Sequence, residues 1–331
     1  MTPSILLAVP NVSEGRDAAT IERIATAFAG GPAPAVAAGS VRLLDVHSDG
    51  DHHRSVFTLA GRAGELSVAL LRGAAVAVES IDVVARASGR AEDRGAHPHV
   101  GAIDVVPLVY FDARARGAAC AEALVVGDRI ASELDVPVFI YGELAGGRPD
   151  TARADFRRGG LPTLARRMAG ELDGAPPLRP DFGPPAPHPS AGATLVAVRE
   201  PLVAFNLQLR PPADVGDARR IAALIRDGGE YGLPGVRAIG VALSDGVAQV
   251  SMNVERPLEI ALAEVVVAVA RHAPLESAEL VGLAPRAALD GFPDDLPLAG
   301  FDRERHVIES ALSASGVDAP RSRGNAAGEN D

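Results

Sequence analysis

The sequence predicts an α+β fold in which two ferredoxin-like βαββαβ units follow one another in tandem and enclose a substrate cleft. Two observations lead to this prediction. The same order of strand-like apolar runs and helical-period segments occurs twice along the chain. A proline-rich stretch at residues 174–189 separates the two halves, and its prolines exclude a helix or a central strand there. We therefore expect a first unit at residues 1–180, a second at residues 181–314 and a disordered tail at residues 315–331.

The first half contains strand-like and helical segments in the order βαββαβ. Ile5 to Val9 is a short apolar run closed by Pro10. Asp17 is suited to cap the following helix, in which apolar side chains recur at helical spacing. A long segment rich in alanine, valine and leucine predicts a second helix at residues 65–80. Further strands are expected at residues 41–46, 54–59, 100–106 and 136–141, and further helices around Cys120 and at 150–172, the latter with a basic flank that we expect to be solvated.

The second half repeats this order. Ser244-Asp245-Gly246 predicts a hairpin turn, because glycine adopts positive φ without strain. The expected strands are residues 194–209, interrupted at Pro201, and residues 236–243, 247–254 and 279–283. The expected helices are residues 215–226 and 258–271, with a final helix at residues 303–314.

The composition limits the class of protein. The chain has 331 residues, a net charge of −11 and one cysteine, Cys120. The negative charge argues against nucleic-acid binding, although a local pocket of arginines or backbone amides still accommodates an anionic small molecule. A single cysteine excludes internal disulfides and is typical of a reducing compartment. The N-terminus lacks a signal-peptide pattern and no apolar run reaches the length of a membrane span, so we expect a soluble, cytoplasmic protein without a membrane partner.

Residues 94–107, RGAHPHVGAIDVVP, contain the candidate catalytic group. His97 and His99 are two residues apart, so in an extended chain their side chains share a face at the entrance of a strand. Asp104 lies deeper in the apolar run, where a carboxylate needs a partner. A buried acid near an imidazole suits proton transfer near neutral pH. The alternative is a strand-entry loop whose histidines are ordinary surface residues.

Several short sequence motifs occur along the chain in a characteristic order and spacing: VPNVSEGRD, LLDVHSD, HRSVFTLAG, GAHPHVGAIDVVP, VPVFIYGE, PDFGP, VAFNLQL and ELVGLAPRAAL. With these motifs the chain resembles the formiminotransferase domain family, found in bacterial glutamate formimidoyltransferases and in the N-terminal part of the animal formiminotransferase–cyclodeaminases. The resemblance runs from Val9 to about Ala314. The family's helical cyclodeaminase domain is not matched by any part of this sequence.

The resemblance implies two ferredoxin-like subdomains with a substrate tunnel between them, usually assembled as a homodimer. It implies transfer of a formimino group from N-formimino-L-glutamate to N5 of tetrahydrofolate, a step of histidine degradation and one-carbon metabolism. Tetrahydrofolate is then a co-substrate, and no metal is expected. The catalytic histidine of the family's GxHP motif corresponds to His97. The folate-lining segment corresponds to residues 183–192, with Gly183, Pro184, Pro189, Ser190 and Gly192 as the residues expected to contact folate.

The implied chemistry assigns roles to further residues. The attacking N5 sheds a proton and the departing glutamate nitrogen gains one, and one imidazole that titrates near neutrality performs both transfers. We expect Asp104 to orient or tune His97. Arg54 suits bidentate binding of a substrate carboxylate, although a surface arginine at a strand start is an equally good interpretation. The other residues expected to bind substrate are Asp45, a second carboxylate, together with His53, His99, Asn11 at the cleft mouth and Asn206, which is either structural or bound to the pterin.

Two positions depart from the family's usual residues. His99 stands where the family usually has arginine, and His53 stands where it usually has asparagine. Replacing an arginine removes a permanent charge and a planar fork of donors. The segment from Ile81 to Gly95 is also longer than the family pattern leads us to expect. The alternative function is therefore a related folate enzyme acting on formylated donors such as 5-formyltetrahydrofolate or N-formylglutamate.

Two further hypotheses belong to other classes. A metal-dependent hydrolase would use a cluster of side chains, namely His52, His53, His97, His99, Asp49 and Asp51. Against it, the sequence contains no known metal-ligand spacing. A non-catalytic folate binder or assembly protein would retain the fold with an altered site.

Overall fold

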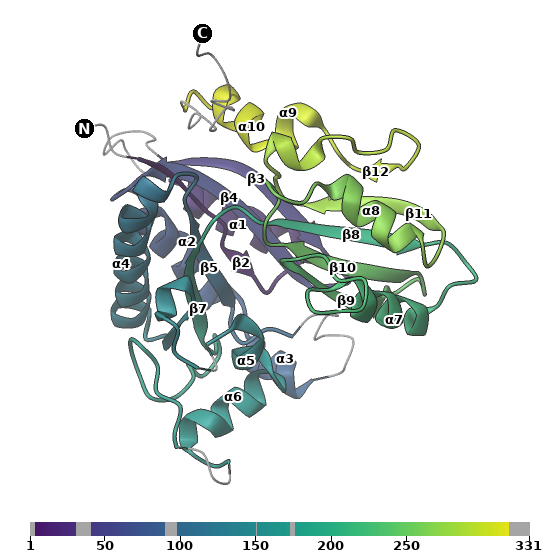
Figure 1. The fold of residues 1–331 in the computed structure, drawn as a ribbon. Helices are drawn as coiled ribbons and strands as arrows, with labels where there is room; N and C mark the ends of the chain where they lie inside the picture. The colour runs from purple at the N-terminus through teal and green to yellow at the C-terminus, as the bar shows by residue number, and fades with distance from the viewer. Residues whose placement is uncertain (1–3, 31–40, 90–97, 150, 173–175, 318–331) are drawn as a thin grey trace.

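The computed structural model describes residues 4–30, 41–89, 98–149, 151–172 and 176–317. These residues form an α+β fold, as the sequence predicted, with two sheets and helices packed on them (Figure 1). The first half of the chain, coloured purple to teal, builds the larger sheet, and the green second half builds the smaller one. None of the described helices is long and apolar enough to cross a membrane.

The strands of the larger sheet are β1 (Ile5–Ala8), β2 (Asn11–Val12), β3 (Arg42–Asp49), β4 (Arg54–Arg62), β5 (Ile103–Val109), β6 (Val138–Gly142) and β7 (Thr194–Arg199). The smaller sheet contains β8 (Val203–Leu209), β9 (Val236–Ala242), β10 (Ala248–Val254), β11 (Leu275–Val281) and β12 (Leu298–Ala299). The helices are α1 (Ala18–Ala29), α2 (Leu66–Ser80), α3 (Val83–Ser88), α4 (Arg116–Leu134), α5 (Arg153–Arg157), α6 (Gly160–Ala169), α7 (Val215–Ile225), α8 (Leu262–Ala270), α9 (Arg303–His306) and α10 (Ile308–Ala314).

The larger sheet has β3 at one edge, followed by β4, then β1 and β2, then β5, β7 and β6. The pairs from β3 to β5 are antiparallel, whereas β7 pairs in parallel with both β5 and β6. The sequence placed residues 194–199 at the start of the second half, but they form β7, a buried strand inside the first sheet. The first sheet therefore extends past residue 180 to Arg199. The proline-rich stretch before β7 is anchored to the first half, for example by the Val138 N–H donating to Phe182 O at 2.9 Å.

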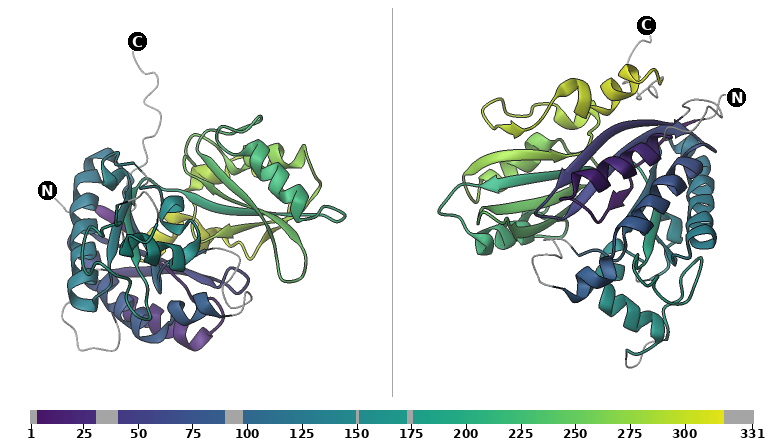
Figure 2. Two further views of the ribbon diagram at one scale, coloured as in Figure 1. Left: turned by 90° about the horizontal axis from the view of Figure 1, so that it is seen from below. Right: turned by 180° about the vertical axis from the view of Figure 1, so that it is seen from behind.

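Helices cover the two faces of the larger sheet unequally. On one face α1, α2 and α4 lie side by side (Figure 2) and form the main core with Phe57 and its neighbours. Phe28 of α1 packs so closely on α2 that a Cβ on Gly73 would lie 2.1 Å from the Phe28 ring. On the opposite face α5 and α6 pack over β5, β6 and β7, with Phe156 among the buried residues. Residues of β3 and β4 on that face contact the second half of the chain.

The smaller sheet has the strand order β12, β11, β8, β10, β9, with antiparallel pairing from β11 to β9. Its core lies under α7 and α8 and includes Phe205 and Leu207. Because side chains alternate along a strand, Asn206 and Gln208 face the other side of the sheet. Gln249 of β10 lies opposite Gln208 and is buried. The sheet thus presents a polar face away from its helices.

An apolar cluster joins the two halves of the chain. It combines three residues of the first sheet, Leu7, Ala60 and Val109, with Leu283, Ile308, Ala311 and Leu312. The final helix expected at residues 303–314 is divided into α9 and α10 at Val307, because Val307 forms a parallel bridge with Ala284. Of the tail expected at residues 315–331, residues 318–331 lie outside the described residues.

Candidate active site

Asp104 is a fully buried carboxylate on β5 that contacts three parts of the chain. Its Oδ1 accepts a hydrogen bond from the Val100 backbone N–H at 2.8 Å. Its Oδ2 forms an ion pair with the Arg157 guanidinium of α5 and lies 3.5 Å from Nη2 of Arg54, at the start of β4. The sequence indicated that this acid needs a partner, and the structure supplies two arginines.

The charges around Asp104 keep its carboxyl group ionised. Burial alone would raise the pKa of Asp104, but Arg157, Arg54 and the nearby His99 hold that pKa below its ordinary value. Burial, followed by repulsion from Arg157, lowers the pKa of Arg54 to about 9, which still leaves Arg54 charged at neutral pH. Asp104 therefore acts as an anion that orders arginines, and its affinity for protons near pH 7 is low.

Two more arginines extend the positive charge. Arg153 lies one turn before Arg157 on α5, and Arg199 is the last residue of β7. Burial and then repulsion from Arg157 lower the pKa of Arg153, and burial lowers the pKa of Arg199 to about 10. Glu255, just after β10 of the second sheet, is close enough to stabilise the charges of Arg153 and Arg199. This positive region therefore reaches the second half of the chain.

The basic flank of the expected helix at residues 150–172 divides into buried and exposed arginines. Arg158 fits the expectation of a solvated face, because its side chain is 78% exposed and pairs with Asp155 at 2.7 Å. For Arg157 that expectation is wrong, because this residue is only 8% exposed. No local pattern separates the two neighbours. The need of Asp104 for a partner was the available signal.

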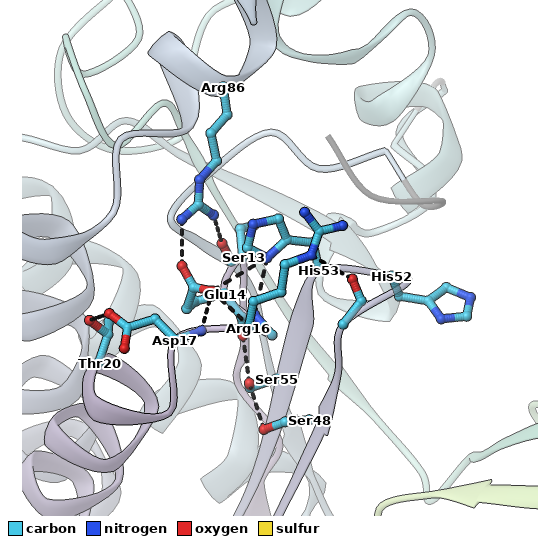
Figure 3. Close-up of polar contacts among 12 residues, drawn as sticks. Ser13, Glu14, Arg16, Asp17, Thr20, Ser48, His52, His53, Ser55 and Arg86 are labelled. Carbon is cyan, nitrogen blue, oxygen red and sulfur yellow. Dashed lines mark hydrogen bonds and ion pairs between the residues drawn. The ribbon is translucent and has the colours of Figure 1, made fainter. Parts of the chain in front are cut away.

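A second buried carboxylate, Glu14, holds the loop at the end of β2 (Figure 3). Its Oε1 accepts the backbone N–H groups of Arg16 at 2.9 Å and Asp17 at 3.0 Å. Its Oε2 pairs with the Arg86 guanidinium, which also donates to Ser13 O. Burial opposes ionisation, but these hydrogen bonds and the charge of Arg86 lower the pKa of Glu14. Since Arg86 belongs to α3, this network ties the loop to the helix that precedes the GxHP motif.

His53, which the sequence predicted to bind substrate, is buried beside this loop (Figure 3). Its Nδ1 accepts the Gly15 backbone N–H at 3.1 Å and lies 3.4 Å from Oε1 of Glu14. A Cβ on Gly15 would lie 2.1 Å from Asp49 O, so the loop at the end of β2 is in close contact with the end of β3. His53 therefore orders the loop, and its contact with substrate stays a prediction.

Polar side chains connect β3 with the second sheet. Asn206 donates from Nδ2 to Oε2 of Glu279 at 2.9 Å, and Oε1 of Glu279 lies 3.5 Å from Nε2 of His47. Asp45, two residues before His47, is buried, and its Oδ1 lies 4.0 Å from Nε2 of His306. Asp45 and Asn206 thus both lie where the two halves meet. Sequence reasoning missed His47 and Glu279, although the alternation of Asp45 and His47 on one strand face was a usable signal.

The predicted folate segment, residues 183–192, lies against the residues that follow the GxHP motif. Gly192 is so close to Val100 that a Cβ on Gly192 would lie 2.2 Å from the Val100 carbonyl oxygen. The Ser190 carbonyl accepts the backbone N–H of Val83, the first residue of α3, at 2.9 Å. A cavity of about 260 Å³ is lined by Pro185, Ala186 and Pro187 together with residues of α6. Contact of Gly183, Pro184, Pro189, Ser190 and Gly192 with folate stays a prediction.

The predicted catalytic residue, His97, lies outside the described residues. His99, two residues further on, is half-buried and close enough to Asp104 to affect its pKa. Asn11 is half-buried in β2 and donates from Nδ2 to Val9 O at 3.0 Å. Neither the cavity beside α6 nor a second one of about 410 Å³ near Phe139 is lined by Asp104. A tunnel between the halves stays a prediction.

In the part of the chain that the structure describes, no group of three or more His, Cys, Asp or Glu side chains is arranged to hold a metal ion. His52, one of the residues of the metal hypothesis, lies with its Nδ1 2.5 Å from Oδ2 of Asp49.

Comparison with known proteins assigns the chain to a family. Residues 5–199 match the model of the formiminotransferase domain, N-terminal subdomain. The chain is 34% identical over 316 residues to a glutamate formimidoyltransferase of Streptococcus pyogenes serotype M1, covering 93% of this chain and 98% of that protein. It is 34% identical over 319 residues to a glutamate formimidoyltransferase of Thermoplasma acidophilum, covering 93% of this chain and 97% of that protein. It is 36% identical over 303 residues to the formimidoyltransferase-cyclodeaminase of Sus scrofa, covering 85% of this chain and 50% of that longer protein.

The α+β fold and the buried, arginine-rich site therefore belong to a protein related to one-carbon transferases. The chain is a member of the formiminotransferase domain family. The matched region of the N-terminal subdomain ends at residue 199, which is also the last residue of β7 and of the first sheet.

We expect the substitution Asp104→Asn to lower the free energy of unfolding by about 3–5 kcal/mol, because it leaves two buried guanidinium groups without their shared anion. Urea denaturation of the purified variant measures this change. The control is Glu276→Gln, whose partner Arg210 has a side chain 58% exposed. We expect the control substitution to lower the free energy of unfolding by no more than about 1 kcal/mol. An Asp104→Asn variant as stable as this control would contradict the ion-pair network.

The pair His47–Glu279 makes stability depend on pH. Burial alone would lower the pKa of His47, but Glu279, Asp45 and Asp49 raise it above its ordinary value of 6.5. The His47 hydrogen bond lowers the pKa of Glu279 below its ordinary value of 4.5, although burial opposes this. A raised histidine pKa stabilises the fold below pH 6.5 and is lost at higher pH, whereas a lowered carboxyl pKa stabilises above pH 4.5 and is lost in acid.

We therefore expect the stability difference between the native chain and a His47→Gln variant to be largest between pH 4.5 and 6.5. Denaturation at a series of pH values measures it. A difference that does not decline as the pH rises from 6.5 to 9 would contradict the pairing.

Proposed function

We propose that this chain is a glutamate formimidoyltransferase, which transfers the formimino group from N-formimino-L-glutamate to N5 of tetrahydrofolate. The observation that carries the proposal is the overlap with two glutamate formimidoyltransferases, which spans 93% of this chain and at least 97% of each relative. Tetrahydrofolate is the co-substrate, and the proposed reaction needs no metal. In this role the chain would act in histidine degradation and one-carbon metabolism.

The strand order supports two ferredoxin-like subdomains. In each half the first strand lies between the third and the fourth, as β1 lies between β4 and β5, and β8 lies between β10 and β11. The boundary that fits both sheets lies between Arg199 and Val203. The single cysteine favours a reducing, cytoplasmic location, and the resemblance favours a homodimer.

The proposed reaction moves one proton between two nitrogens. N5 of tetrahydrofolate attacks the formimino carbon and loses its proton to His97. His97 then returns the proton to the glutamate nitrogen as the bond between carbon and that nitrogen breaks, which yields 5-formiminotetrahydrofolate and L-glutamate. Asp104 acts as a positioning residue for this segment. Its hydrogen bond fixes Val100, and Cα atoms three residues apart are separated by at most about 10 Å.

The contacts of the described residues support a substrate cleft between the two sheets. Arg54 and His99 lie beside Asp104 on the first half. Asp45 lies at the junction of the halves, and Asn206 reaches it from the second sheet. The folate segment at residues 183–192 is hydrogen-bonded to the start of α3 and lies against Val100. Donor and folate would then meet beside the GxHP motif.

We expect His97→Ala to lower kcat by about 10²–10⁴-fold with N-formimino-L-glutamate and tetrahydrofolate, because the proton carrier is removed. Formation of the folate product, followed by absorbance, measures this loss. His272→Ala is the matched control, since His272 packs on Tyr231 in the second half, away from the site. A fully active His97→Ala enzyme would contradict the role of His97. If the native chain instead used N-formylglutamate or 5-formyltetrahydrofolate alone, the alternative donor class would replace this proposal.

A further inference from the structure

The geometry points to Arg54 and Arg157 as a carboxylate-binding pair, held by Asp104, that recognises one carboxylate of the glutamyl donor. This inference rests on the proposed function and names the side chains that set its donor specificity. Arg157 belongs to no motif of the sequence analysis. Its position near Arg54 follows from the fold, because α5 packs over β5 and both guanidinium groups contact Asp104 of that strand.

Both carboxylate oxygens of Asp104 already have partners within the chain. One of its oxygens faces both guanidinium groups, and the other accepts the Val100 N–H. Two guanidinium groups thus share the carboxylate of Asp104, and Asp49 is a second anion close enough to Arg54 to affect its pKa. In a water-poor site such an excess attracts a further anion strongly. The half-buried Arg153 adds a third positive charge close by, and Glu255 offsets part of that charge.

The two arginines also have unused donors. Nε of Arg54 and Nε of Arg157 are buried, and neither has a hydrogen-bond partner among the described residues. A buried donor without an acceptor costs free energy, which a ligand that supplies the acceptor recovers. A carboxylate matches the planar guanidinium group and brings the missing negative charge. The Arg54 side chain is 14% exposed and the Arg157 side chain 9%, so part of each remains in contact with solvent.

The position of the pair favours the donor over the tail of the folate. Asp104 accepts the Val100 N–H, and Val100 follows the proposed catalytic histidine by three residues in the sequence. The carboxylates of N-formimino-L-glutamate lie only a few bonds from the reacting nitrogen. The carboxylates of tetrahydrofolate lie beyond its aminobenzoyl group, far from N5.

The test compares Arg157→Gln with Arg157→Lys and with the native chain. The donors are N-formimino-L-glutamate and its two monoamides, each of which lacks one carboxylate. For the native chain we expect about tenfold or greater loss of kcat/KM with one monoamide, since a charge-assisted contact is lost. For Arg157→Gln we expect about tenfold higher KM for the dicarboxylate, a smaller change in kcat and loss of that discrimination. Arg157→Lys keeps the positive charge but loses the planar guanidinium group, so we expect its KM to lie between those of the native chain and Arg157→Gln.

Arg158→Gln is the matched control, because it removes an exposed arginine from the neighbouring position and should leave every constant unchanged. Thermal melting verifies that each variant is folded, and calorimetry with L-glutamate gives a binding readout independent of turnover. If Arg157→Gln does not fold, the ratio of kcat/KM for the dicarboxylate and the monoamide in Arg157→Lys tests the inference. Two results would overturn this inference and leave the proposed function intact. In the first, the folded Arg157 variants still prefer the dicarboxylate over the monoamide as strongly as the native chain does. In the second, the native chain turns over all three donors with equal kcat/KM. A native chain that neither binds L-glutamate nor uses any formimino donor would overturn the proposed function.

Discussion

One buried carboxylate holds together the parts of the chain from which the site is built. Asp104 joins β5 to the start of β4 through Arg54, to α5 through Arg157, and to the turn after the GxHP motif through Val100. A fully buried charge is tolerated only with such partners. The same arrangement leaves an excess of positive charge, so the requirement that stabilises the fold also creates a preference for anionic ligands.

The second half of the chain completes this arrangement from the other side. Its sheet turns a polar face with Asn206, Gln208 and Gln249 away from its own helices. The contacts of Glu279 with His47 and of His306 with Asp45 fix the second half against β3. Apolar packing between Leu7, Ala60 and Leu283 holds the halves together beside these polar contacts. Substrate specificity can therefore depend on residues of both halves, while Glu14 and Arg86 order the loop at the end of β2.

The order of helices and strands was predictable, because strand-like runs and helical spacing leave local patterns. The position of β7 in the first sheet was not predictable, since a short apolar run does not reveal whether its partner strands precede or follow it in the sequence. The burial of Asp104 could be expected from its apolar neighbours, but Arg157 lies 53 residues away and resembles its solvated neighbour Arg158. The alternation of Asp45 and His47 indicates a shared strand face, but it does not reveal Glu279 as the partner, because Glu279 belongs to the other half of the chain. The role of His97 follows from the GxHP motif, since that residue lies outside the described part of the chain.

The most direct measurement is a crystal structure of the protein with tetrahydrofolate and the product L-glutamate. We expect one glutamate carboxylate within hydrogen-bonding distance of the Arg54 or Arg157 guanidinium group. We expect the folate to lie against residues 183–192, with its N5 facing the imidazole of His97 and the glutamate nitrogen. Glutamate bound away from both arginines, or a folate that does not approach His97, would contradict the central claim that the Asp104 cluster and the GxHP motif form one site.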